Sequence, residues 1–255
     1  MARRALVVLA VAMTGVGFGC RANTVQLGFE PTVGASYRYR YEVDATITRT
    51  VEGEDPRTTE LTVTLETTQK VVEITDDGAL LEVTLTSSSS PEPSTATVLV
   101  DRAGSLQAIQ QIDGLPASTT GLSTDALLAA AATRTPDRPL AVGDRWEIRD
   151  GTITGDGRLD RLGVLDGDSA AVVEIDLLEV LNATEETAGS EVVLDGDLRT
   201  SATTAFDLAD GSVREGRTRS HGDVDVLIAA PVGVTAPAVA ARVTYELRVT
   251  TTREG

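Results

Sequence analysis

Cysteine, histidine, lysine and aromatic residues are all scarce in this chain of 255 residues. It contains one cysteine, Cys20, one histidine, His221, and one lysine, Lys70, and aromatic residues make up 3% of it. A lone cysteine cannot form an internal disulfide, and with a single histidine it cannot supply the usual ligand set of a zinc site. Because rings are so few, the core must be aliphatic, in keeping with the 41% hydrophobic content.

Basic residues are also few relative to acidic ones. The chain has 39 acidic residues against 22 basic ones, which gives a formal net charge of −17. Such a chain repels nucleic acid, and an anionic membrane surface does not attract it electrostatically. We therefore expect no nucleic-acid partner, and contact with a membrane would require a covalent anchor.

No motif of catalytic or metal-binding chemistry stands out. There is no Gly-x-Ser-x-Gly sequence to complete a triad with His221, which we interpret as a turn or strand-end residue. The Asp-Gly-Asp sequences at 166–168 and 195–197 lack the rest of a calcium-binding loop and are predicted to be hairpin turns. The sequence leaves open whether two carboxylates form a catalytic pair of the glycosidase type, because the fold decides whether they lie close enough to each other. We predict no catalytic, metal-binding or cofactor-binding residues, no cofactor and no enzymatic activity.

The first residues read as an export signal. Met1 to Arg4 carry positive charge, and the apolar run from Ala5 to Val16 is too short to span a bilayer as a helix. The run ends at Gly17-Phe18-Gly19-Cys20, which resembles the bacterial lipoprotein signal, although the family usually has Leu and a small residue where Gly17 and Phe18 stand.

The resemblance implies that residues 1–19 are a signal peptide and that Cys20 is the lipidation site. It places the protein in the cell envelope, exported and held to a membrane through its N-terminal lipid. Arg21 follows the cysteine in place of the aspartate that favours inner-membrane retention, which implies the outer membrane if the organism has two. A secreted protein with a free thiol and an uncleaved anchor are the alternatives.

Beyond a tether over residues 20–30, the sequence alternates between apolar and polar residues as half-buried strands do. The alternation is clearest over 37–48, 61–66 and 243–250, and Asp76-Asp77-Gly78 is typical of a tight hairpin turn. The serine- and proline-rich stretch 87–94 is predicted to be a loop. One short helix is predicted near 122–132, where Leu122 and Leu128 could face a sheet before Pro136 bars continuation.

Two similar segments suggest two similar halves. Val33-Gly34 and Val142-Gly143 each follow a proline and each precede an aromatic residue that enters a strand. We divide the single β-rich domain, 31–255, into halves at 31–120 and 139–253, joined by the helix. Duplication explains this order of features, but so does repeated use of the same turn chemistry.

These patterns predict a mainly β fold: a large antiparallel curved sheet, or a half-barrel or sandwich, of roughly ten to thirteen strands with one short α-helix. The architecture resembles the LolA and LppX group of envelope lipoproteins and lipid carriers, and the resemblance implies a half-barrel that holds acyl chains. A non-enzymatic, surface-anchored lipoprotein that binds a lipid or other hydrophobic ligand is the leading hypothesis. A structural or protein-interaction module with a solid core is the alternative. Candidate cavity-lining residues, which core packing explains equally, are Tyr37, Tyr39, Tyr41, Leu122, Leu128 and Trp146.

Overall fold

The computed structural model describes residues 24–88, 90–104, 106–113, 134–187, 190–230 and 237–254. These residues form strands, turns and loops, and none of them is helical. The predicted signal peptide, the predicted lipidation site Cys20, and the predicted helix near 122–132 with Leu122 and Leu128 lie outside the described residues.

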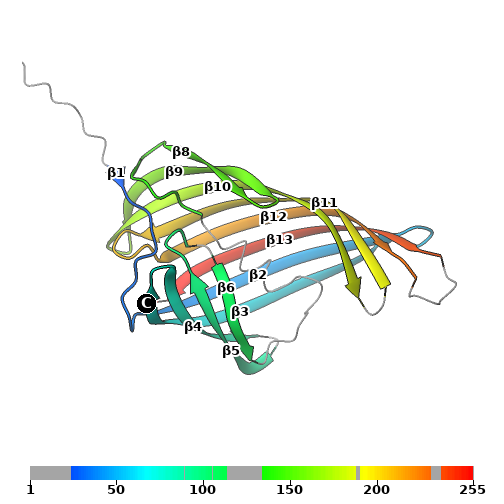
Figure 1. Cartoon of the computed structure of the whole chain (residues 1–255), viewed down its shortest axis with the longest axis horizontal. Coiled ribbons are helices and arrows are strands. Elements are labelled where there is room, and N and C mark those ends of the chain that lie inside the picture. Colours follow the sequence, from blue (N-terminus) through cyan, green and yellow to red (C-terminus); the bar gives the residue numbers. More distant parts are fainter. Residues whose placement is uncertain are drawn as a thin grey trace, which may run out of the picture.

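Eleven of the strands form one antiparallel sheet in the order β6-β5-β4-β3-β2-β13-β12-β11-β10-β9-β8, and β1 pairs with β7 beside it (Figure 1). The strands are β1 Thr24–Val25, β2 Ser36–Val51, β3 Arg57–Thr75, β4 Gly78–Ser87, β5 Ser90–Val100, β6 Leu106–Asp113, β7 Leu140–Ala141, β8 Arg145–Asp150, β9 Ile153–Leu165, β10 Asp168–Thr187, β11 Ser190–Asp207, β12 Val213–Ile228 and β13 Val239–Glu254.

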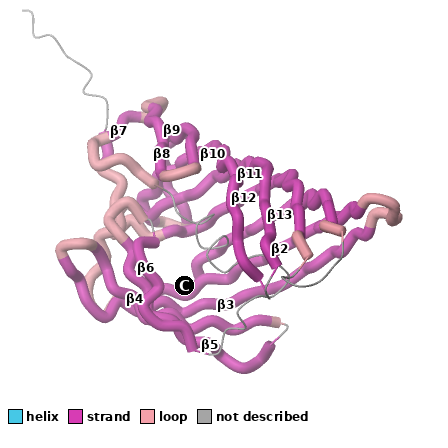
Figure 2. The backbone as a smooth tube through the Cα atoms, turned by 45° about the vertical axis from the view of Figure 1, so that its right-hand side comes forward, coloured by secondary structure: helices cyan, strands magenta, loops and turns pink. Residues whose placement is uncertain are grey.

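The prediction of a large antiparallel β architecture is confirmed, in the form of a single sheet and not a sandwich. The sheet is strongly bent (Figure 2), and it is open, because β6 and β8 lie at opposite ends of the strand order without pairing with each other. The final strand, β13, has no counterpart in the first half of the sequence. It fills the centre of the sheet, between β2 and β12.

Glycines on one face allow the long strands to bend. Gly157 in β9 lies opposite Trp146, and Gly222 in β12 lies opposite Tyr245. An added Cβ at either glycine would come within 2.1 Å of the facing ring. A large ring that covers a glycine on the next strand restores the packing that the glycine lacks, while the missing side chain lets the sheet coil. We call this side of the sheet the inner face.

The core lies on the inner face near one end of the sheet, which we call the closed end. One cluster lies under β8 to β11 and includes Trp146 and Phe206, and a second lies under β2 to β5 and includes Tyr37 and Val71. The segment before β2 crosses both, because Leu27 packs in the first cluster and Phe29 against the second. Full burial of a leucine such as Leu27 contributes about 2 kcal/mol.

The same segment was expected to be part of a tether. From Thr24 onward it is instead part of the folded domain, since Thr24–Val25 pairs with β7 and Leu27 is buried. Its backbone is also fixed, because the Phe29 amide donates to the Arg102 carbonyl (2.8 Å) and the Glu30 amide donates to the Asp210 carbonyl (2.9 Å). These bonds join the segment to turns from the two wings of the sheet.

Two local predictions are wrong. The stretch predicted as a loop at 87–94 continues β4 to Ser87 and begins β5 at Ser90, so the loop shrinks to a tight turn. Pro91 and Pro93 fit here because they lie in the register irregularity between the Ser87–Ser90 and Leu85–Ser94 pairs of β4 and β5. Asp195-Gly196-Asp197 lies within β11 and not in a hairpin turn, whereas Asp166-Gly167-Asp168 does form one.

Candidate functional site

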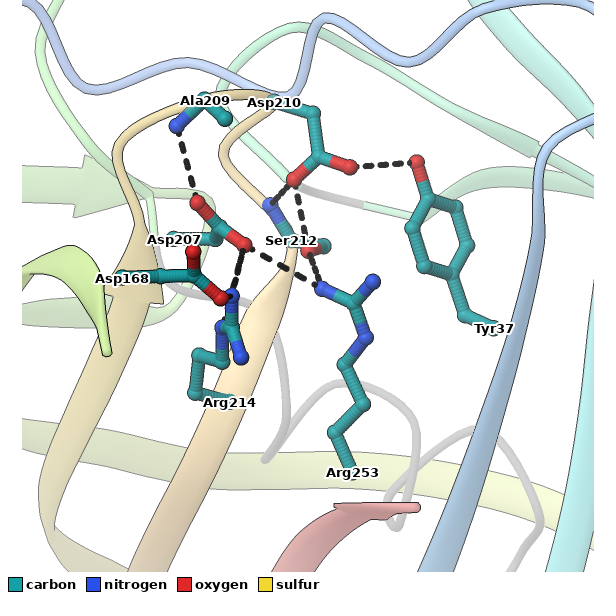
Figure 3. Close-up of polar contacts among 8 residues, drawn as sticks. All are labelled: Tyr37, Asp168, Asp207, Ala209, Asp210, Ser212, Arg214 and Arg253. Atoms are coloured by element: carbon teal, nitrogen blue, oxygen red, sulfur yellow. Dashed lines mark hydrogen bonds and ion pairs between the residues drawn. The ribbon is translucent and has the colours of Figure 1, made fainter. Parts of the chain in front are cut away.

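A polar cluster closes one end of the sheet, around the turn between β11 and β12 (Figure 3). Asp207, whose side chain is only 8% exposed, accepts hydrogen bonds from Arg214 (Nη2 to Oδ2, 2.6 Å) and from the Ala209 amide (2.9 Å). Arg253 lies 3.5 Å from the same carboxylate, and Arg214 also pairs with Asp168. Two arginines from different strands therefore share one buried carboxylate.

Asp210 connects this cluster to the tyrosines of β2. The Tyr37 hydroxyl donates to Asp210 Oδ2 (2.8 Å), the Ser212 hydroxyl donates to Oδ1 (2.6 Å), and Arg253 donates to the Ser212 hydroxyl (2.7 Å). Burial by itself would raise the pKa of Asp210, but the bonds from Ser212 and Tyr37 and the charge of Arg253 together lower it. The carboxylate is thus held ionised, and it joins β2 to the turn between β11 and β12.

The predicted lining residues of β2 form a stack of rings on the inner face. Tyr37, Tyr39 and Tyr41 alternate along the strand, with ring centroids 6.5 and 6.2 Å apart. Tyr37 and Tyr39 are buried in the core, and the Arg253 guanidinium lies 4.9 Å from the Tyr37 ring centre. Trp146 is buried in the other cluster, so the structure does not bring it together with the tyrosines.

All four tyrosines of the chain should resist ionisation in the native state. Burial is the main cause that raises the pKa of each, assisted at Tyr37 by the bond to Asp210 and at Tyr245, to about 12, by the charge of Glu179. The neutral rings therefore stabilise the fold fully below pH 10, the ordinary pKa, and this contribution is lost as pH rises through the raised values.

The measurement is an ultraviolet titration of tyrosinate with and without denaturant. We expect little tyrosinate in the folded protein at pH 10, half-ionisation there in denaturant, and unfolding at higher pH. Native titration with a pKa of 10 would show that the rings are solvated.

Past the core, aliphatic side chains continue along the inner face toward the other end of the sheet, with Glu179 and Arg49 beside them on the same face. We call this surface the distal strip. Its side chains come from five adjacent strands, are cross-strand or same-face neighbours, and are partly exposed. The strip comprises Val51, Leu181, Ala183, Leu194, Val226, Ala241 and Val243. An apolar surface left only half-covered on one face of a sheet is the kind that binds a nonpolar molecule.

The outer face behind the distal strip is charged. The residues that alternate with the strip include Asp195, Asp223, Asp225 and Arg242, which line a shallow open depression with His221, and Arg242 Nε pairs with Asp223 (2.7 Å). His221, predicted at a turn or strand end, lies within β12 and is exposed on this face. Leu178 and Val180 line the same depression, so the outer face there is rich in charge but not uniformly polar.

Neither metal ligands nor a membrane-spanning helix is found in the part of the chain that the structure describes. No group of three or more His, Cys, Asp or Glu residues there could hold a metal ion. No described helix is long and apolar enough to cross a membrane.

Comparisons with known proteins give weak likenesses of fold. No family model matches the chain, and no curated protein matches it in sequence. Among solved structures it is similar to a LolA superfamily protein from Nitrosomonas europaea, at 10% identity and a TM-score of 0.18, over 85% of this chain and 86% of that one. It is also similar to a loop-deletion form of OmpT, an outer membrane protein of Vibrio cholerae, at 8% identity and a TM-score of 0.20, over 86% and 100%. Both scores are too low to carry a functional argument, although the first names the group suggested by the sequence.

Proposed function

We propose that this protein is a non-enzymatic envelope lipoprotein, held to a membrane by a lipid on Cys20, that binds an acyl chain or similar hydrophobic molecule on its inner face. The observation that carries the proposal is the distal strip: an aliphatic surface that extends beyond the packed core and backs onto a charged outer face. Nonpolar walls are all that an acyl chain requires, and burying apolar surface drives its binding.

The closed end supports the same proposal. There the fold is already packed by Leu27, Phe29 and the tyrosines, and the polar groups of Asp207 and Asp210 are satisfied internally. No ligand is needed to complete that end. The surface left for a ligand is therefore the distal part of the inner face.

Native mass spectrometry of the full-length protein, extracted in a mild neutral detergent, tests the proposal. We expect two mass increments, one from acylation at Cys20 and one from a noncovalently held lipid that is lost on collisional activation. A mature protein with neither increment would contradict the proposal. Acylation without a held lipid would favour a structural or interaction module.

A charge within the distal strip should abolish binding. Val226 lies on the inner face between Leu194 and Ala241, while the next residue, Leu227, lies on the outer face. In the V226E variant a ligand would bury an unpaired carboxylate, so we expect affinity for a fluorescent fatty acid to fall more than about tenfold. The L227E variant carries the same change one residue away and should bind normally. Equal affinities in the two variants would place the ligand elsewhere.

A further inference from the structure

Arg134 is an incompletely paired cation on the inner side of β8. Its side chain is 13% exposed, and its Nη2 lies 3.0 Å from Asp150, itself 65% exposed. Its Nε and Nη1 atoms are buried and have no hydrogen-bond partner among the residues that the structure describes. A buried guanidinium donor without an acceptor is costly, which calls for a physical explanation.

The position of Arg134 is fixed by the fold. Its carbonyl accepts the indole N–H of Trp146 (3.2 Å), and its backbone adopts a φ of 40°, a conformation that non-glycine residues rarely take. Trp146, Ile148 and Asp150 alternate along β8 on the inner face, so contacts to the first and last of them place Arg134 along that side of the strand. Strained residues with unsatisfied donors are found preferentially where a ligand binds.

We infer that Arg134 recognises the anionic head of the amphiphile whose chain lies on the inner face. This inference rests on the proposed function and adds the ligand class: a single- or multiple-chain lipid with a carboxylate or phosphate head. Guanidinium donors match both groups, and their hydrogen bonds are charge-assisted and short. The acidic excess of the chain, −17 overall, makes an incompletely paired arginine the more notable, since carboxylates to pair its remaining donors are abundant.

The test compares ligands that differ only in their head. Palmitic acid, palmityl phosphate and palmityl alcohol are added separately to the full-length protein in neutral detergent, and affinities are read by native mass spectrometry. The acid, the phosphate or both should bind about tenfold or more tightly than the alcohol, and the stronger of the two identifies the source of the head.

Three variants separate recognition of the head from folding. R134Q should lose the preference for the charged ligands while keeping affinity for the alcohol. R149Q removes the same charge from the exposed outer side of β8, where Arg149 pairs only with Glu147 among the described residues, and should keep the preference. D150N removes the competing carboxylate and should strengthen binding of the charged ligands a few-fold.

Each other outcome counts against the inference. If all ligands bind equally to the natural protein, or if R134Q keeps the preference or loses the alcohol as well, Arg134 does not read the head, although the proposed function stands. If no ligand binds at all, the proposed function fails together with the inference.

Discussion

Replacing Gly157 by alanine is expected to lower the free energy of unfolding by about 2–4 kcal/mol. The added Cβ would lie 2.1 Å from Cε2 and 2.3 Å from Cζ2 of Trp146, far inside contact distance. The ring cannot move sideways freely, because it packs in the core with Leu27 and Leu140, and its indole N–H is bonded to Arg134. Either the ring leaves its place or β9 and β8 separate.

Urea unfolding measures the loss, and fluorescence reports its cause, since Trp146 is the only tryptophan of the chain. We expect the G157A emission to shift to longer wavelength in the native state as the ring becomes solvated. Gly163 is the matched control: it lies in the same strand, and an added Cβ meets nothing within 4 Å. G163A should change stability by less than about 0.5 kcal/mol and leave the emission unchanged. Similar losses in both variants would mean that strand glycine itself, and not the ring above it, sets stability.

Replacing Gly211 by alanine should destabilise the protein by about 3–5 kcal/mol. Gly211 has a φ of 71°, which strains any side chain, and an added Cβ would lie 1.8 Å from the Gly28 carbonyl oxygen. That oxygen is backbone, so it cannot rotate away. The segment that carries Leu27 and Phe29 across the core would have to lift from the β11–β12 turn.

Gly143→Ala separates the two contributions. Gly143 has a φ of 91°, but an added Cβ there meets nothing within 4 Å, so G143A should show the backbone strain alone, about 1 kcal/mol. Amide hydrogen exchange supplies the second reading. The Phe29 and Glu30 amides, bonded to the carbonyls of Arg102 and Asp210, should lose protection in G211A and keep it in G143A. Unaltered protection in G211A would show that the crossing segment is not held by this contact.

The strands could be predicted from the sequence because their signal is local. The alternation from Tyr37 to Thr48 fixes which residues of β2 face the core, and Asp76-Asp77-Gly78 fixes the hairpin between β3 and β4, since both depend only on neighbouring residues. The same local logic fails at Asp195-Gly196-Asp197. A glycine between two aspartates fits a turn, and it also fits a strand whose backbone is approached closely by its neighbour. Only the pairing with Asp223 to Asp225 of β12 shows that Asp195 to Asp197 belong to a strand.

The polar cluster could not be predicted, because its members come from distant parts of the chain. Nothing in the sequence around Tyr37 or Asp210 indicates that their side chains are hydrogen-bonded to each other. Arg253 is one of many arginines in strands of alternating polarity, so its ion pair with Asp207 is not indicated either. The only local signal is the composition of residues 207–211, Asp-Leu-Ala-Asp-Gly, which is typical of a turn but does not indicate its partners. Arg134 is similar: its significance lies in two donors that the fold leaves unpaired, a property that no spacing of residues encodes.

The place of β13 between β2 and β12 sets the order in which the protein can fold. Until this last strand emerges, β2 and β12 each present a long row of unpaired amides and carbonyls, and neither half can complete the central ladder. Such distant pairing makes assembly slow and leaves the nascent chain open to association with other chains. A newly made chain should consequently remain only partly folded until β13 has been synthesised.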